Sequence, residues 1–101
     1  MINHIVMWKL KDHAEGAGRA ANALEMKRRL DACALLVPGI LAFEVRLAEP
    51  GLEATCDVVL YAQFADQAAL AAYAAHPAHQ ALAPFFKAVR DRRECMDYTT
   101  S

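Results

Sequence analysis

The sequence has few cysteines, no large excess of either charge and no long apolar run. Its three cysteines lie far apart without a Cys-x-x-Cys pair, which predicts free thiols in a reducing compartment rather than a disulfide framework. The longest apolar stretch, residues 32–43, is interrupted by Pro38-Gly39 and is too short for a transmembrane helix. The first residues also lack the pattern of a secretory signal. We therefore expect a soluble cytoplasmic protein with no membrane partner.

The net charge and the length of the chain indicate which partners and how many domains to expect. Eleven lysines and arginines against twelve aspartates and glutamates give a formal net charge of −1, which does not favour binding to nucleic acid. The apolar fraction of the 101 residues is high, at 56%. A chain of this length that folds alone buries only about 60–70% of the surface that its unfolded form exposes. We expect a single domain over residues 1–101, and we expect part of its apolar surface to contact a partner.

The first part of the chain predicts a strand, a helix and two further strands. Residues 4–10 read H-I-V-M-W-K-L, which has the β-branched and aromatic character of a strand. Apolar residues then recur at spacings of three and four from Ala23 to Val37, which predicts an amphipathic helix that ends at Pro38-Gly39. Alternating apolar residues predict strands over residues 40–47 and 57–64, joined by a turn-forming connection.

The rest of the chain predicts helical segments and a closing strand. Asp66 is a suitable N-cap for an alanine-rich helix over residues 67–75. Pro77 ends that helix, because proline cannot continue it. Beyond Pro77 we expect, in order, a short helical turn over residues 78–83, another over 85–90, and a fourth strand over 92–99.

This order of elements, β-α-β-β-α-β, predicts a ferredoxin-like α+β fold, with a four-stranded antiparallel sheet and the helices on one face. The first strand is apolar on both faces, with Val6 and Trp8 on one and Ile5 and Met7 on the other. The helices can cover only one of these faces. We therefore expect a homodimer in which the sheet of an identical subunit covers the other face.

Histidines and a tyrosine are concentrated in residues 73–79, which read Y-A-A-H-P-A-H. The proline breaks the helix there, and free backbone N–H groups at such a break favour a polarised oxygen or an anion. Tyr73, His76 and His79 are therefore candidate site residues. Alternatively, Tyr73 packs in the core and His76 caps a helix. We expect no metal site, because H-x-x-H supplies two ligands at most and no H-E-x-x-H pattern is present.

Two polar residues in predicted strands are further candidates. His4 shares a strand face with Val6 and Trp8, and Asp97 lies in the last strand, so either side chain can face an apolar space. A buried carboxylate needs a partner. For Asp97 the alternatives are an arginine or a backbone amide, which would be structural, and an imidazole, which the carboxylate would orient for catalysis.

Several segments of the sequence together resemble a known family. The chain opens with H-I-V-M-W-K-L-K, continues with V-P-G-I followed by F-E-V, then contains L-A-A-Y-A-A-H-P-A-H-Q, and closes with M-D-Y. In these segments, from Asn3 to Tyr98, it resembles the stress-responsive A/B barrel (Dabb) family of dimeric α+β barrels. The H-P-x-H block is the most specific of them. The resemblance implies a ferredoxin-like protomer whose sheet packs on that of its twin.

The resemblance also implies a chemistry. The best-understood enzyme of this type is a plant polyketide cyclase, which closes a linear polyketide by an intramolecular aldol step without metal or cofactor. Its catalytic histidine matches His79, the carboxylate partner matches Asp97, the catalytic tyrosine matches Tyr73, and a further pocket histidine matches His4. The resemblance therefore implies a general base, a carboxylate that orients it, and a hydroxyl that binds the carbonyl oxygen.

Two functions follow as expectations. The first is a cofactor-independent cyclase, lyase or isomerase that acts on a carbonyl-bearing, polyketide-like small molecule in an apolar barrel cavity. The second is a non-catalytic small-molecule-binding or stress-responsive dimer, in which Asp97 and His79 form a buried structural pair. For the first function, the expected catalytic residues are His79, Asp97 and Tyr73, and the expected substrate-binding residues are His4, Trp8 and His76.

Overall fold

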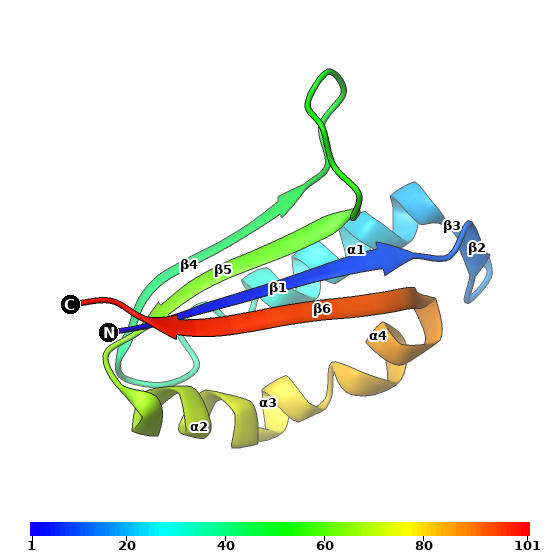
Figure 1. Ribbon diagram of the computed structural model, residues 1–101. Helices are drawn as coiled ribbons and strands as arrows, with labels where there is room; N and C mark the ends of the chain where they lie inside the picture. The colour runs from blue at the N-terminus through cyan, green and yellow to red at the C-terminus, as the bar shows by residue number, and fades with distance from the viewer.

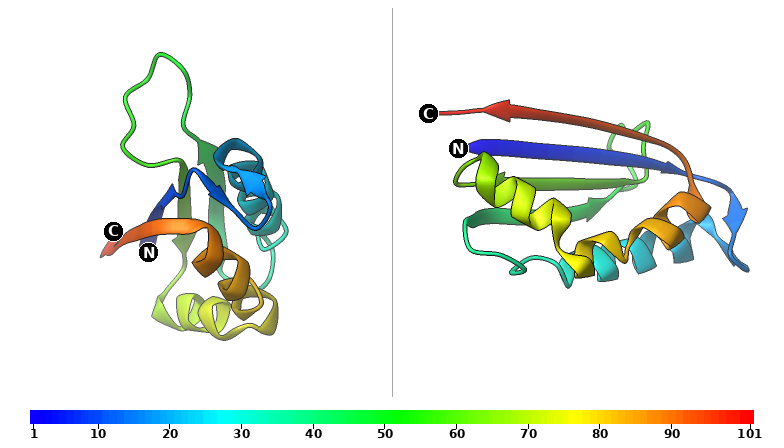
Figure 2. Two further views of the ribbon diagram at one scale, coloured as in Figure 1. Left: turned by 90° about the vertical axis from the view of Figure 1, so that its right-hand side faces the viewer. Right: turned by 90° about the horizontal axis from the view of Figure 1, so that it is seen from below.

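The computed structural model describes residues 1–101 as a sheet with helices packed on one side (Figures 1 and 2). None of the helices is long and apolar enough to cross a membrane. In chain order the elements are β1 (Ile2–Leu10), β2 (His13–Ala14), β3 (Ala17–Gly18), α1 (Arg19–Asp31), β4 (Ile40–Leu47), β5 (Val58–Phe64), α2 (Gln67–Ala75), α3 (Pro77–Gln80), α4 (Ala83–Val89) and β6 (Arg90–Thr99).

Four strands form one antiparallel sheet in the order β4-β5-β1-β6. β1 lies in the centre, where Val6 pairs with Leu60 of β5 on one side and with Cys95 of β6 on the other. The helices lie on one side of this sheet, as the view from below shows (Figure 2). The predicted ferredoxin-like α+β fold is confirmed.

The core lies between the sheet and the helices. Alternate residues of β1 and β5 point toward the helices, so Val6, Trp8, Leu60 and Phe64 are buried while their neighbours in the strands are more exposed. Each large apolar side chain that is fully buried contributes about 1.5–3 kcal/mol. The helices and the turn after α1 also contribute buried residues to this core: Ala23, Met26, Leu30, Cys33, Tyr73, Phe86 and Val89.

The first helix is shorter than its apolar spacing predicts. α1 ends at Asp31, and the predicted extension to Val37 is wrong. The backbone N–H groups of Cys33 and Leu36 bond carbonyls three residues earlier, so the chain continues in tight turns rather than as an α-helix. These turns keep the apolar residues on the core side, which is why the spacing resembles that of one long helix.

The polar segment before α1 contains a small hairpin that its residue pattern does not predict. β2 and β3 are joined by Glu15 and Gly16, which have φ values of 53° and 74°. Positive φ at both central residues is typical of a type I′ turn. Asn22 of α1 donates from Nδ2 to the carbonyls of Ala14 and Ala17, and this holds the hairpin against the helix.

The break between α2 and α3 follows from proline chemistry. Asp66 caps α2 as predicted, because its side chain accepts from the Ala69 N–H at 2.8 Å. His76 has an extended backbone (φ −62°, ψ 134°), the conformation that Pro77 imposes on the residue before it. The chain therefore changes direction there, and α2, α3 and α4 follow one another near the β6 side of the sheet (Figure 1).

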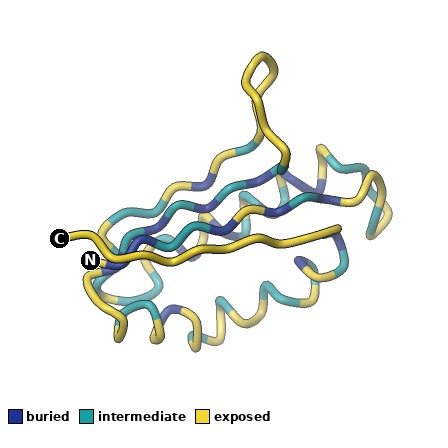
Figure 3. The backbone as a smooth tube through the Cα atoms, viewed as in Figure 1, coloured by how far each residue is buried: buried dark blue, intermediate teal, exposed yellow.

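The face of the sheet opposite the helices is not covered. We call it the open face. β6, at the sheet edge, is exposed along almost its whole length (Figure 3). By strand register and alternation, the large apolar side chains on the open face are Ile5, Met7, Val59, Tyr61, Met96 and Tyr98.

Candidate functional site

A cavity of about 280 Å³ lies between the sheet and the segment from α2 to α4. Val6 and Trp8 of β1 and Leu60 of β5 form its floor, and Phe86 of α4 and His79 of α3 contribute to its wall. Trp8 was predicted to line the substrate site, and its indole packs edge-on against Phe86 with ring centroids 5.5 Å apart. A mostly apolar hollow with a few polar groups is typical of small-molecule sites.

His79 presents one imidazole nitrogen to the protein backbone. Its Nδ1 lies 3.3 Å from the carbonyl oxygen of Ala74. A carbonyl can only accept, so this bond requires the proton on Nδ1 and leaves Nε2 as the basic nitrogen of the neutral ring. Burial lowers the pKa of His79, and the charges of His4 and Arg93 lower it further against the opposing effect of the Ala74 bond. The ring is therefore predominantly neutral near pH 7.

Asp97 bonds His4 rather than His79. The two residues are directly opposite each other in β1 and β6, and His4 Nδ1 lies 2.5 Å from Asp97 Oδ1. The His4 side chain is 13% exposed and that of Asp97 is 46% exposed. The structure thus gives Asp97 an imidazole partner, but it does not show the predicted pair with His79. The reason is strand register, which brings Asp97 to the histidine on its neighbouring strand.

Tyr73 packs beside His79 in the core. The two rings are 4.5 Å apart between centroids, and Phe64 lies 5.3 Å from Tyr73 on another side. The Tyr73 hydroxyl is buried and has no hydrogen-bond partner. Burial, with a smaller effect from Cys33, raises the pKa of Tyr73 far above its ordinary value. Tyr73 does not line the cavity, so the structure does not bring its hydroxyl to the space where a ligand carbonyl would lie.

His76 is a helix cap and not part of the cavity lining. Its Nδ1 accepts a hydrogen bond from the Ala78 N–H at 3.0 Å, which satisfies a free donor at the start of α3. The structure therefore supports the capping alternative for His76 rather than substrate binding. Nowhere do three or more histidine, cysteine, aspartate or glutamate side chains gather closely enough to hold a metal ion.

Sequence comparison identifies the family. Residues 2–100 match the profile of the Stress responsive A/B Barrel Domain, Dabb. The chain belongs to the Dabb family. The predicted resemblance is therefore confirmed over nearly the whole sequence. No curated protein matches this Dabb chain significantly by sequence.

Solved structures share the fold of this Dabb protein. A dimeric protein of unknown function and ferredoxin-like fold from Bacteroides fragilis is 28% identical, with a TM-score of 0.81 over 98% of this chain and 95% of that one. A dimeric ferredoxin-like protein of unknown function from Jannaschia sp. CCS1 is 26% identical, with a TM-score of 0.74 and 98% of each chain covered. SnoaB, a cofactor-independent oxygenase from Streptomyces nogalater, is 18% identical, with a TM-score of 0.73 over 99% of this chain and 92% of that one. The likeness to SnoaB shows the fold alone.

The Dabb cavity also contains charged residues that were not among the predicted site residues. Lys87 of α4, Arg90 at the start of β6, and Arg93 of β6 line it. Arg93 pairs with Trp8 in the strand register and therefore faces the helices. Alternation along β6 is the signal that could have found Arg93, because Arg93 lies four residues from Asp97 and therefore on the same face.

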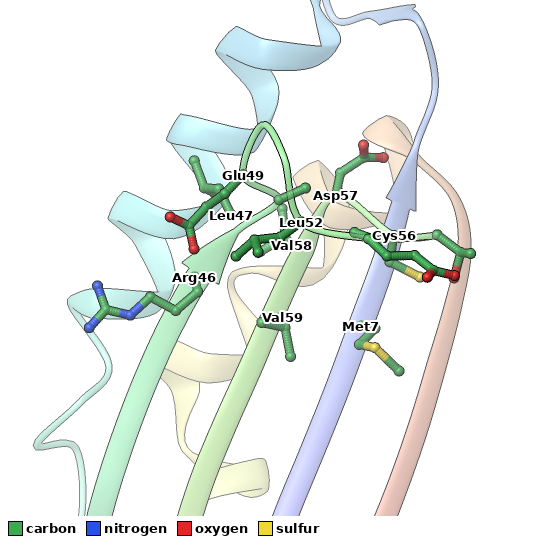
Figure 4. A pocket seen from close by; sticks show the side chains of 13 residues that line it. Met7, Arg46, Leu47, Glu49, Leu52, Cys56, Asp57, Val58 and Val59 are labelled. Carbon is green, nitrogen blue, oxygen red and sulfur yellow. The ribbon is translucent and has the colours of Figure 1, made fainter.

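A second, larger hollow of about 650 Å³ lies on the open face of this Dabb protein. Residues of the loop between β4 and β5, such as Leu52 and Cys56, lie near Met7 and Val59 of the sheet (Figure 4). None of the predicted site residues lines this hollow. The histidines therefore define the smaller cavity as the candidate active site, and the larger hollow belongs to the uncovered face.

Proposed function

We propose that this Dabb protein is a homodimeric, cofactor-independent cyclase, lyase or isomerase of the reducing cytoplasm. It would remove a proton beside a carbonyl group of a small, polyketide-like molecule. The observation that carries the proposal is the state of His79, whose neutral ring is bonded through Nδ1 to Ala74 and lines an apolar cavity. A neutral imidazole with a free nitrogen is the form that a general base requires at neutral pH.

The chemical step would proceed as follows. His79 Nε2 takes a proton from the carbon beside the carbonyl, and the electron pair of that C–H bond moves through carbon to give an enolate. In a cyclase the enolate carbon then attacks a second carbonyl of the same molecule, and the resulting alkoxide takes the proton from His79 Nε2, which restores the neutral base. In an isomerase a proton returns to a different carbon. Neither sequence of steps needs a metal or an oxidant.

His4 and Asp97 would stabilise the oxygen on which charge develops. Asp97 accepts from His4 Nδ1 and so fixes the orientation of a ring that lines the same cavity as His79. When His4 carries a second proton, its Nε2–H is a donor for the enolate oxygen. Tyr73 would position His79 through ring packing, because its hydroxyl is buried away from the cavity.

The homodimer would form through the open face. That face exposes large apolar side chains, with Met7 38% exposed and Met96 67% exposed. Contiguous apolar surface on a sheet is typical of an interaction site. Two solved structures that are more than 25% identical to this chain are described as dimeric, which supports a second copy as the partner.

Hydrogen exchange in heavy water tests the role of His79. The first probe is the neutral γ-keto ester methyl 4-oxo-4-phenylbutanoate, and β-keto and polyketide-like compounds follow; NMR measures the exchange of the protons beside each ketone. The protein should accelerate their exchange, and His79→Ala should lower the rate by about 100-fold, the usual contribution of a general base. Because the pKa of His79 is lowered, the rate should be maintained as pH falls to 6.5 and should decline only below it.

A matched control is His13→Ala, which removes an exposed histidine from β2 and should leave the exchange rate unchanged. Equal rates for the native protein and His79→Ala would remove His79 as the base. Binding of the ketones without any acceleration of exchange would favour the alternative, a non-catalytic ligand-binding dimer. That alternative is consistent with two structural roles of the histidines. His4 bonds Asp97 across the sheet, and His76 caps α3.

A further inference from the structure

The cations of this protein divide into two groups by their partners. Eight of the eleven lysines and arginines make an ion pair or a side-chain hydrogen bond, for example Lys27 with Asp31 and Arg92 with Glu94. The remaining three, Lys87, Arg90 and Arg93, make neither. These same three side chains line the cavity that holds His79.

The cavity therefore has an uncompensated positive charge. No aspartate or glutamate is among its lining residues, although the protein as a whole has a net charge of −1. The two guanidinium groups come from positions close together in the chain, at the junction of α4 and β6. A planar guanidinium matches the two oxygens of a carboxylate, and the match is strengthened where apolar walls lower the local dielectric.

The placement of Asp97, the carboxylate that bonds the lining residue His4, fits an anionic ligand. Asp97 lies four residues beyond Arg93 in β6, which corresponds to roughly 13 Å along the strand. Asp97 is also engaged by His4. A negative group held near Arg90 and Arg93 would thus lie at the opposite end of this strand segment from Asp97 and would avoid repulsion from it.

We propose that the cavity binds a compact organic acid whose carboxylate lies against Arg90 and Arg93. The apolar part of the acid packs on Trp8 and Phe86. Its carbonyl group lies toward His79, and this last element rests on the proposed function, whereas the carboxylate site does not. The cavity volume of about 280 Å³ matches a small acid better than a long acyl chain. Lys87 adds a third positive charge at the wall.

Binding of a matched pair of probes tests the carboxylate site. The pair is 4-oxo-4-phenylbutanoate and its methyl ester, which share the ring and the ketone and differ in charge. Isothermal titration calorimetry of the full protein at low ionic strength should give about tenfold or tighter binding for the acid, as one or two charge-assisted hydrogen bonds provide. In Arg90→Gln/Arg93→Gln the preference should fall to within about twofold, because the amides carry no charge.

Two further variants control the experiment. Arg92→Gln removes the same charge from the neighbouring residue of β6, which faces the other side of the sheet, and should keep the preference for the acid. Arg93→Lys keeps a positive charge at this position and should retain part of the preference for the acid. Light scattering and circular dichroism on each variant show that fold and assembly are retained, as expected for a substitution of the exposed Arg93.

The outcomes separate this inference from the proposed function. Equal binding of acid and ester, no measurable binding of the acid at millimolar concentration, or an equal loss of preference in Arg92→Gln would overturn the carboxylate site. The exchange reaction of the neutral ketone would be unaffected by such a result. Conversely, an acid preference that depends on Arg90 and Arg93 stands even where His79→Ala leaves proton exchange unchanged.

Discussion

At the scale of single residues, two histidines of the same cavity differ in what their Nδ1 atoms contact. His79 meets the backbone carbonyl of Ala74, and His4 meets the carboxylate of Asp97. The carbonyl fixes the tautomer of His79 without adding a charge, so burial keeps that ring neutral. The carboxylate accepts from the His4 ring and fixes its orientation. The cavity therefore contains one neutral histidine and a second histidine that a carboxylate orients.

Removal of the Tyr73 hydroxyl should stabilise the protein. This hydroxyl is buried without a partner, and such a group costs about 1–3 kcal/mol. Tyr73→Phe should therefore raise the free energy of unfolding by about 1 kcal/mol and, because the ring stays, change the rate of proton exchange by less than about threefold. Urea denaturation followed by the fluorescence of Trp8, the only tryptophan, and the NMR exchange assay measure the two quantities.

Tyr73→Leu separates the ring from the hydroxyl. Loss of the ring that contacts His79 should lower the exchange rate by about tenfold or more through poorer positioning of the imidazole. A rate that falls as far in Tyr73→Phe as in His79→Ala would contradict a purely positioning role and would assign the hydroxyl a direct part in the reaction.

The sequence pattern singled out residues that lie near one another better than it predicted their pairings. His4, Trp8 and His79 line the same cavity, and their roles in a site stay a prediction. The partner of Asp97 could not be predicted, because strand register decides it and depends on how the whole sheet aligns. The exclusion of Tyr73 from the cavity depends on helix rotation against the core, which residue spacing alone does not specify.

At the scale of elements, one glycine controls how closely α2 approaches the start of β4. Gly39 has a φ of 91°, and a Cβ atom at this position would lie 2.8 Å from the Cβ of Ala69. Its carbonyl also accepts from the Ala65 N–H at 2.8 Å. Both the left-handed backbone and the contact with α2 therefore require a residue without a side chain.

Substitution of this glycine should be more costly than substitution of an equivalent one in open space. Gly51 has a similar φ of 86° but has nothing within 4 Å of its added Cβ, so Gly51→Ala should cost only about 1 kcal/mol of backbone strain. Gly39→Ala should cost about 1–3 kcal/mol more, because the helix must shift. Urea denaturation of both variants measures the difference, and equal losses would show that α2 moves away freely.

Element boundaries were predictable where a capping residue or a strand alternation specified them. The bounds of β4 and α2 agree with those expected from alternation and from the Asp66 cap. Apolar spacing does not predict the end of α1, because successive tight turns keep the same spacing as a helix. The β2–β3 hairpin cannot be predicted from alternation, because its strands are only two residues long.

At the scale of the whole molecule, the apolar excess of the sequence is divided between the core and the open face. Met96 of β6 is 67% exposed and pairs with Ile5 in the centre of that face. Because Met96 is exposed in the protomer, a charge at this position should disturb its folding little. The same charge would be buried without a partner in a dimer formed through this face.

Met96→Glu should therefore shift the protein from dimer to monomer. Light scattering should give about twice the chain mass of 11.1 kDa for the native protein and a value near that mass for the variant. Leu24→Glu is the matched control, because Leu24 is 61% exposed on α1, on the opposite side of the sheet. A native protein that is monomeric, or a Met96→Glu variant that remains dimeric, would contradict an interface at the open face.

The adjacency of β1 and β6 also determines when the site comes into existence. His4 and Asp97 are 93 positions apart in the chain and bond each other across neighbouring strands. Closing so long a loop costs conformational entropy, which the packing of β6 against β1 must offset. The cavity is therefore complete only when β6 has docked and has brought Asp97 to His4 and Arg93 to the floor formed by β1 and β5.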